Sequence, residues 1–198
     1  PDEKETMKVM TAKKIDSKNL TTSKQTVEKL QKSLQAKAKA EPSYRFYSLW
    51  DKVYRSDILF IAYAQCYRNK GSAGADDITF DDIESQEGGR NKWLGDLQQE
   101  LQTKRYRPEP LLRVWIPKSN GSKRPLSIPS IRDRVVQMAM LLVLGPIFEE
   151  DLSPRQYAFR PGVDAKMAVR RVYFQITKHR RREIVDGDLS DYFGTIPH

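Results

Sequence analysis

The sequence predicts an α+β fold in which helices surround a β-hairpin, with one further strand near residue 185. Apolar residues recur at helical spacing up to about residue 107 and again beyond residue 131. Between these stretches, residues 111–116 and 124–128 are predicted as paired strands joined by the turn 119–122. The segment 183–189 contains Ile184, Val185 and Leu189 and is predicted as the further strand.

The composition of residues 1–40 predicts a basic amino-terminal extension that is partly disordered or helical. Only Val27, Leu30 and Leu34 form an apolar stripe, and lysines surround it, so we expect a solvated and partly frayed helix. A basic arm that folds on RNA is the alternative.

Residues 41–107 predict a helical block that begins after the break at Pro42. Helical spacing continues through residues 46–53, and a second helix runs from Ile58 to about Asn69, with Ser56 and Asp57 as its expected caps. One or two more helices cover residues 80–101, with an interruption near residues 88–89.

Two helices are predicted after the hairpin. Residues 132–149 are apolar on nearly every face of a helix, so this helix is expected to be buried. The second helix spans 164 to about 178 and offers apolar side chains for packing: Met167, Val169, Val172, Phe174 and Ile176.

The composition favours a polyanionic partner. The 198 residues include 35 Lys and Arg against 26 Asp and Glu, a formal net charge of +9. Nucleic acid is the commonest polyanion that such a field attracts, with an anionic membrane surface as the other candidate. The single cysteine and two histidines exclude an intrachain disulfide and a zinc site built from Cys and His. No apolar run approaches the roughly 18 residues of a membrane span and no secretory signal is recognisable, so we expect a reducing, non-secretory compartment.

The hairpin turn carries the first candidate site. A two-residue loop at Asn120–Gly121 would set Lys118 opposite Lys123, and a three-residue loop with a bulge would set Lys118 opposite Arg124. Either arrangement places two cations together, which an anion between them would stabilise. A triphosphate suits Lys and Arg chemically, although a solvent-exposed hairpin with solubilising lysines remains the alternative.

The acidic residues near residue 188 are the second candidate site. On one strand Asp186 and Asp188 would point to the same face. Carboxylates at a strand end are typical of magnesium-dependent phosphoryl transfer, but they are also common where a strand simply ends in a polar turn.

Four blocks of this sequence resemble reverse transcriptases and maturases of the bacterial group II intron type. Residues 116–118 with 123–137 resemble their fingers motif, Tyr157–Gly162 resembles the next block, and Asp188–His198 resembles motif A of the palm. Residues 49–53 with 69–76 resemble the amino-terminal block of this group. The blocks occur in the family's order and cover about residues 44–198, which makes the resemblance specific.

The resemblance implies the fingers of a right-hand polymerase and the first strand of an incomplete palm. Its divisions would be an extension at 1–40, a helical block at 41–107, fingers at 108–180 and the start of the palm at 181–198. The implied roles are catalysis and Mg2+ binding by Asp188, metal binding by the Leu189 carbonyl, triphosphate binding by Lys118 and Arg124, packing under the incoming sugar by Phe193, template binding by Asn69, Lys70 and Gly71, and template or nucleotide contact by Arg160.

The implied activity is RNA-directed DNA polymerisation by two-metal phosphoryl transfer, with intron RNA as template, a DNA primer or target, and dNTP. Gly194 stands where many relatives have an acidic residue, so it receives no role. The paired aspartates of the later palm hairpin are not recognisable, so we expect these residues to be inactive alone. The alternatives are a non-catalytic, maturase-like RNA-binding module and an assembly piece that pairs with the missing palm and thumb or with itself. The expected location is a bacterial cytoplasm or an organelle.

Overall fold

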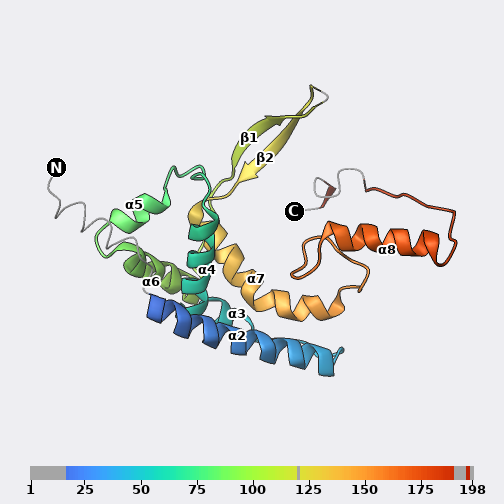
Figure 1. Cartoon of the computed structure of the whole chain (residues 1–198). Coiled ribbons are helices and arrows are strands. Elements are labelled where there is room, and N and C mark those ends of the chain that lie inside the picture. The colour runs from blue at the N-terminus through green and yellow to red at the C-terminus, as the bar shows by residue number, and fades with distance from the viewer. Residues whose placement is uncertain (1–16, 120, 190–194, 197–198) are drawn as a thin grey trace. The chain divides into compact units, whose positions relative to one another are not determined.

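A computed structural model describes residues 17–119, 121–189 and 195–196 of the chain (Figure 1). The chain divides into two compact units, Pro1–Asp151 and Leu152–His198. The first unit contains helices and a two-stranded antiparallel sheet, and the second contains one helix among its described residues. The mixed helical and antiparallel architecture agrees with the predicted α+β class, whereas the assignment to fingers and palm stays a prediction.

Two helices form the centre of the first unit. Helix α4 (Ser56–Asn69) and helix α7 (Ile131–Asp151) pack against each other and contribute most of the buried apolar side chains. Cys66 on α4 is buried, and burial raises the pKa of its thiol.

Helix α2 (Ser17–Ala40) lies across α4 and α7. The expectation that this helix is solvated was wrong for its inner face, because Val27 and Leu34 are buried in the same core. Gln31 Nε2 also donates a hydrogen bond to the Leu142 carbonyl at 3.0 Å. The short apolar stripe is enough because the partner helices supply the rest of the apolar surface.

The connection into α4 differs in detail from the prediction. Only α3 (Trp50–Val53) is helical within the expected stretch 46–53. The N-cap of α4 is Arg55, and no side chain caps it, so the predicted cap was wrong. Asp57 instead pairs with Arg55 at 2.6 Å and accepts a hydrogen bond from the amide of Ile58 at 3.0 Å.

Two helices fill the stretch that the sequence left as one or two. Helix α5 (Phe80–Ser85) begins with a capping box between Thr79 and Asp82, which satisfies two backbone amides at its amino end. Helix α6 (Gly89–Gln102) follows after Gly88, whose φ of 81° is left-handed and favours glycine.

The hairpin consists of β1 (Leu112–Pro117) and β2 (Lys123–Ile128), paired with Ile116 opposite Arg124 and Pro117 opposite Lys123. Both predicted pairings of Lys118 were wrong. Its amide donates to the Ser122 carbonyl at 2.7 Å, and its carbonyl accepts from the amide of Gly121 at 3.0 Å. Gly121 has φ of 81°, as a three-residue loop ending in a left-handed residue requires.

Helix α7 is helical as predicted but is not buried on every face. Val135, Ala139 and Val143 are fully buried, whereas Leu141 and Phe148 are 60% and 59% exposed. One side of this apolar helix therefore faces away from the core of the first unit.

The second unit contains α8 (Ala165–Thr177), which confirms the predicted helix. Asp164 caps it by accepting a hydrogen bond from the Met167 amide at 2.8 Å. None of its residues is buried, so its apolar side chains do not pack as expected within the described residues. The predicted strand 183–189 has no regular secondary structure. A strand needs a neighbour to satisfy its backbone, and β1 and β2 are the only paired strands in the described part of the chain.

Candidate nucleotide and nucleic-acid site

The loop after α4, predicted to contact template, is fixed against the start of α7. Arg134 Nη2 donates to the Ser72 carbonyl at 2.6 Å. A Cβ atom added to Gly74 would lie 2.6 Å from the backbone of Ser130, so only glycine permits this close approach. The loop is thus held by its backbone, while the predicted template-binding residues stay exposed: Asn69, Lys70 and Gly71.

The base of the hairpin is held by Asp133, a buried carboxylate that sequence reasoning did not identify. One carboxylate oxygen accepts a hydrogen bond from the Tyr106 hydroxyl at 2.5 Å, and the other accepts from the Glu109 amide at 3.0 Å. The Asp133 amide donates to Ser130 Oγ at 3.1 Å, immediately after β2. The Asp133 side chain therefore holds the segment that enters the hairpin, and the Asp133 amide bonds to Ser130 in the segment that leaves it.

The same contact perturbs Tyr106. Burial raises the pKa of its phenol, and the hydrogen bond to Asp133 acts in the same direction because it favours the protonated hydroxyl. The buried cluster is therefore a set of satisfied polar groups at the root of an otherwise exposed hairpin.

The hairpin projects from the helices of the first unit, and both of its strands are largely exposed (Figure 1). Because Arg124 pairs with Ile116, two residues before Lys118, side-chain alternation puts Lys118 and Arg124 on one face. They are diagonal neighbours, about 7–8 Å apart. Lys123, opposite Pro117, lies on the other face. The structure thus brings together the two cations that the resemblance assigned to triphosphate.

Arg160 is engaged with the backbone of its own segment. Its Nη1 donates to the Ser153 carbonyl at 2.9 Å and to the Gln156 carbonyl at 3.1 Å. These contacts stabilise the turn at 153–156, so the described geometry gives Arg160 a structural role. Its contact with template or nucleotide stays a prediction.

The predicted catalytic segment is exposed. Asp186, Asp188 and Leu189 lie in irregular, solvent-exposed chain, and Phe193 lies outside the described residues. Carboxylate and carbonyl oxygens are the donors that Mg2+ prefers, so Asp188 and Leu189 fit the ion chemically. Within the described residues, however, no three acidic, His or Cys side chains gather as a metal site would need. These residues can supply part of a magnesium site but not all of it.

No helix in the described ranges is both long enough and apolar enough to cross a bilayer.

Comparison with known proteins identifies the class. Residues 116–198 match the family "Reverse transcriptase (RNA-dependent DNA polymerase)". This stretch includes Lys118, Arg124 and Asp188. The chain belongs to the reverse transcriptases.

Its relatives narrow the class further. The chain is 31% identical over 156 residues to "Group II intron-encoded protein LtrA" of Lactococcus lactis subsp. cremoris, which covers 77% of this chain and 25% of the relative. It is 48% identical over 105 residues to "Protein YkfC" of Escherichia coli, covering 52% of this chain and 28% of the relative. It is 33% identical over 149 residues to "Putative COX1/OXI3 intron 2 protein" of Saccharomyces cerevisiae, covering 72% of this chain and 16% of the relative.

Within the reverse transcriptases, the chain is of the group II intron-encoded type. It spans about a quarter of the length of LtrA and YkfC, 25% and 28%. Reverse transcriptases use a divalent metal such as Mg2+, and their substrates include a nucleic-acid template.

Proposed function

We propose that this chain is the nucleotide-gripping part of an RNA-directed DNA polymerase that copies intron RNA from a DNA primer or target. One observation carries the proposal: the family match covers both the cationic hairpin face and Asp188. The parts of the chain would act with further palm and thumb residues, which supply the paired aspartates that the reaction needs. A bacterial cytoplasm or an organelle is the corresponding location.

The hairpin would hold the incoming dNTP. Lys118 and Arg124 share a face, so both can reach one polyphosphate, with Arg offering a planar fork and Lys a mobile point charge. Asp188 and the Leu189 carbonyl would hold magnesium, and Phe193 would lie under the sugar and favour deoxynucleotides. Template would pass the fixed loop at Asn69, Lys70 and Gly71, with Arg160 as a further contact.

The reaction would form a bond between the primer 3′ oxygen and the α-phosphorus and break the bond from that phosphorus to pyrophosphate. Bound magnesium supplies activation of the hydroxyl and neutralisation of charge on the leaving pyrophosphate. Lys118 and Arg124 would add cationic contacts to the β- and γ-phosphates, which orient the triphosphate for in-line attack.

Primer extension tests this proposal. The chain, supplied with the palm and thumb part of a relative, should extend a DNA primer on an RNA template when Mg2+ is added. Asp188→Asn should abolish extension, whereas Asp186→Asn, two residues away and equally exposed, should retain it. Equal activity of the two variants would contradict the assignment of Asp188.

A second candidate function is a non-catalytic, maturase-like RNA-binding module. The net charge of +9 favours it, because a positive field attracts polyanions such as RNA. RNA binding that persists without any extension by the supplemented protein would support this reading, and its affinity should fall steeply with salt.

A further inference from the structure

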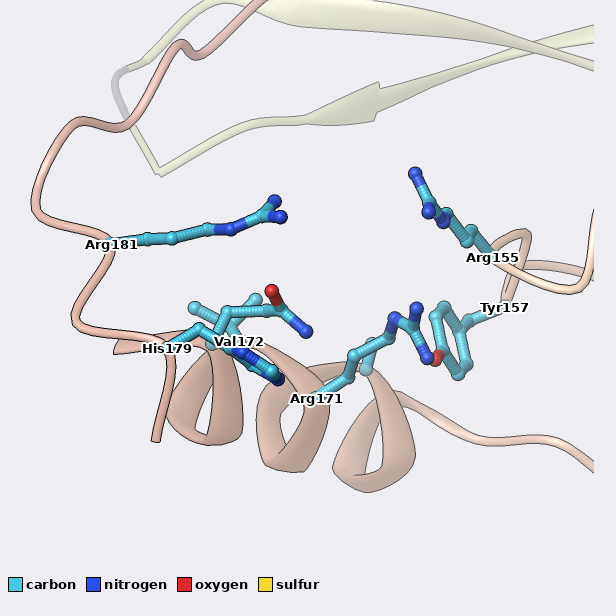
Figure 2. A pocket seen from close by; sticks show the side chains of 8 residues that line it. Arg155, Tyr157, Arg171, Val172, His179 and Arg181 are labelled. Carbon is cyan, nitrogen blue, oxygen red and sulfur yellow. The ribbon is translucent and has the colours of Figure 1, made fainter. Parts of the chain in front are cut away.

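The second unit contains a cavity of about 490 Å³ formed by residues on and around α8. Its polar lining comes from Arg155, Tyr157, Arg171, Gln175, His179 and Arg181 (Figure 2). Three guanidinium groups from three separate segments thus line one space. Figure 2 shows Arg155 and Arg181 projecting from opposite sides, with Arg171 rising from the helix between them.

Backbone contacts hold each of these segments in place. The amide of Arg155 donates to Ser153 Oγ at 3.2 Å, within the turn that Arg160 stabilises. Arg171 stands on α8, whose first turn is capped by Asp164. The amide of Arg181 donates to the Gln175 carbonyl at 3.2 Å, which folds the chain back after the helix.

Among the residues that the structure describes, no carboxylate lines the cavity. Residues 152–182 contain seven Arg and two Lys but one acidic residue, Asp164, which is used as the helix cap. Within the described parts of the chain, no ion pair includes the three arginines of the cavity. Guanidinium groups gathered without counter-charge repel one another, and an anion between them removes that repulsion.

The lining indicates which anion fits. Arg forks match phosphate oxygens, and the rings of Tyr157 and His179 offer flat faces on which a base can stack. The volume lies within the range of about 300–1,000 Å³ typical of small-ligand sites and can hold one nucleotide unit. A protein partner would demand a larger apolar area than this cavity presents.

We propose that this cavity binds the phosphodiester backbone of single-stranded RNA, one phosphate between the arginines and its base against an aromatic ring. The residues that line the cavity include neither the hairpin cations nor Asp188. This proposal rests on the nucleic-acid binding that belongs to the proposed function, and it does not depend on the polymerisation reaction.

Neighbouring arginines provide a matched control. Arg171→Gln with Arg181→Gln removes two cations from the cavity, and Arg170→Gln with Arg182→Gln removes two cations from adjacent positions that do not line it. The full chain and both double variants would be titrated into a fluorescein-labelled single-stranded RNA of about 12 nucleotides. Circular dichroism would verify equal helix content.

We expect the cavity variant to lose about tenfold or more in affinity and the control variant about threefold or less, because only the cavity variant loses direct contacts to the phosphate. Both variants lose the same net charge, so the difference between them reports the position of the arginines. The slope of log affinity against log salt should fall by about 0.7 in the cavity variant, the value for one lost phosphate contact on a single strand. Equal losses in the two double variants would overturn the proposal.

Two further measurements are needed. One distinguishes RNA from free phosphate as the ligand of the cavity, and the other distinguishes failure of this proposal from failure of the proposed function. Pyrophosphate should compete weakly, since it offers no base to stack, and competition as strong as that of unlabelled RNA would overturn the assignment to RNA backbone. RNA affinity is measured on the full chain alone, and primer extension on the unsubstituted chain supplied with the palm and thumb part. No extension, with RNA binding that depends on the cavity arginines, would count against the proposed function alone. Extension, with RNA binding that does not depend on them, would count against this site alone.

Discussion

Alanine substitutions at the hairpin tip should have different effects on dNTP binding, depending on the face of the hairpin that they change. Lys118→Ala and Arg124→Ala should each weaken binding of a Mg2+–dNTP complex, whereas Lys123→Ala should have little effect. All three changes remove one positive charge from the same exposed tip. They differ in the face on which the side chain lies, because Lys123 pairs with Pro117 and Arg124 pairs with Ile116.

The expected magnitude follows from this geometry. A hydrogen bond to a charged phosphate contributes about 1.5–3 kcal/mol, and exposure to solvent and salt reduces this to about 1–2 kcal/mol for each side chain. Each single substitution on the binding face should therefore cost about 5–30-fold in affinity. A charge on the opposite face, about 10 Å from the ligand and screened by salt, should change affinity by about twofold or less.

Equilibrium dialysis of radiolabelled dNTP with Mg2+, repeated at two salt concentrations, would measure these effects. The double variant Lys118→Ala with Arg124→Ala should lose more than either single variant, although neighbouring sites need not add exactly. If Lys123→Ala matched the other two variants, the hairpin would act only through its overall charge, and the triphosphate site on one face would be refuted.

Three further predictions concern stability. In a urea titration, Gly74→Ala should lower the free energy of unfolding of the first unit, because the added Cβ would lie 2.6 Å from the backbone of Ser130. Gly95→Ala should raise it by about 0.5–1 kcal/mol, because the space around the added Cβ is open and alanine favours the helix. Asp133→Ala should cost about 1–3 kcal/mol in the same assay, since two partly buried donors, the Tyr106 hydroxyl and the Glu109 amide, lose a buried acceptor; an unchanged midpoint would contradict that role. Burial raises the pKa of Tyr63, so the native phenol stays protonated while the unfolded phenol ionises near pH 10. Stability should therefore fall as pH rises above about 10, and Tyr63→Phe should flatten that part of the profile.

Local patterns in the sequence predicted most helices and the hairpin, but not their environments. The stripe of α2 was visible as Val27, Leu30 and Leu34, yet its burial depends on α4 and α7, which no local pattern reports. In the same way α8 was predicted as a helix with side chains for packing, and its apolar side is exposed in the described residues.

Register was harder to predict than strand position. The two strands were recognisable, but the partner of Lys118 depends on the left-handed conformation of Gly121 and the loop that precedes it. A shift of one residue in such a loop moves a side chain to the other face, so the cationic face could not be fixed from composition. Side-chain alternation nevertheless keeps Lys118 and Arg124 together in the observed register.

The residues of the candidate sites were likewise predicted only in part. The hairpin cations and the template loop were indicated by motifs, whereas Asp133 gave no signal because one aspartate in an apolar helix has many explanations. The sequence pattern did not single out the cavity arginines. Their convergence depends on the turn that Arg160 holds and on the bend after α8, and neither is a property of a single residue type.

Asp133 also explains how an exposed hairpin can position a ligand. A two-stranded ribbon alone is marginally stable in water, and the described residues bury little of β1 and β2. Its two ends are nevertheless joined to the buried core of the first unit, through Tyr106 and Glu109 before β1 and through Ser130 after β2. A fixed root limits the directions in which the tip can move, so the cations lose less freedom when they bind a triphosphate. Loosening this root should therefore weaken dNTP binding even though Asp133 lies away from the tip.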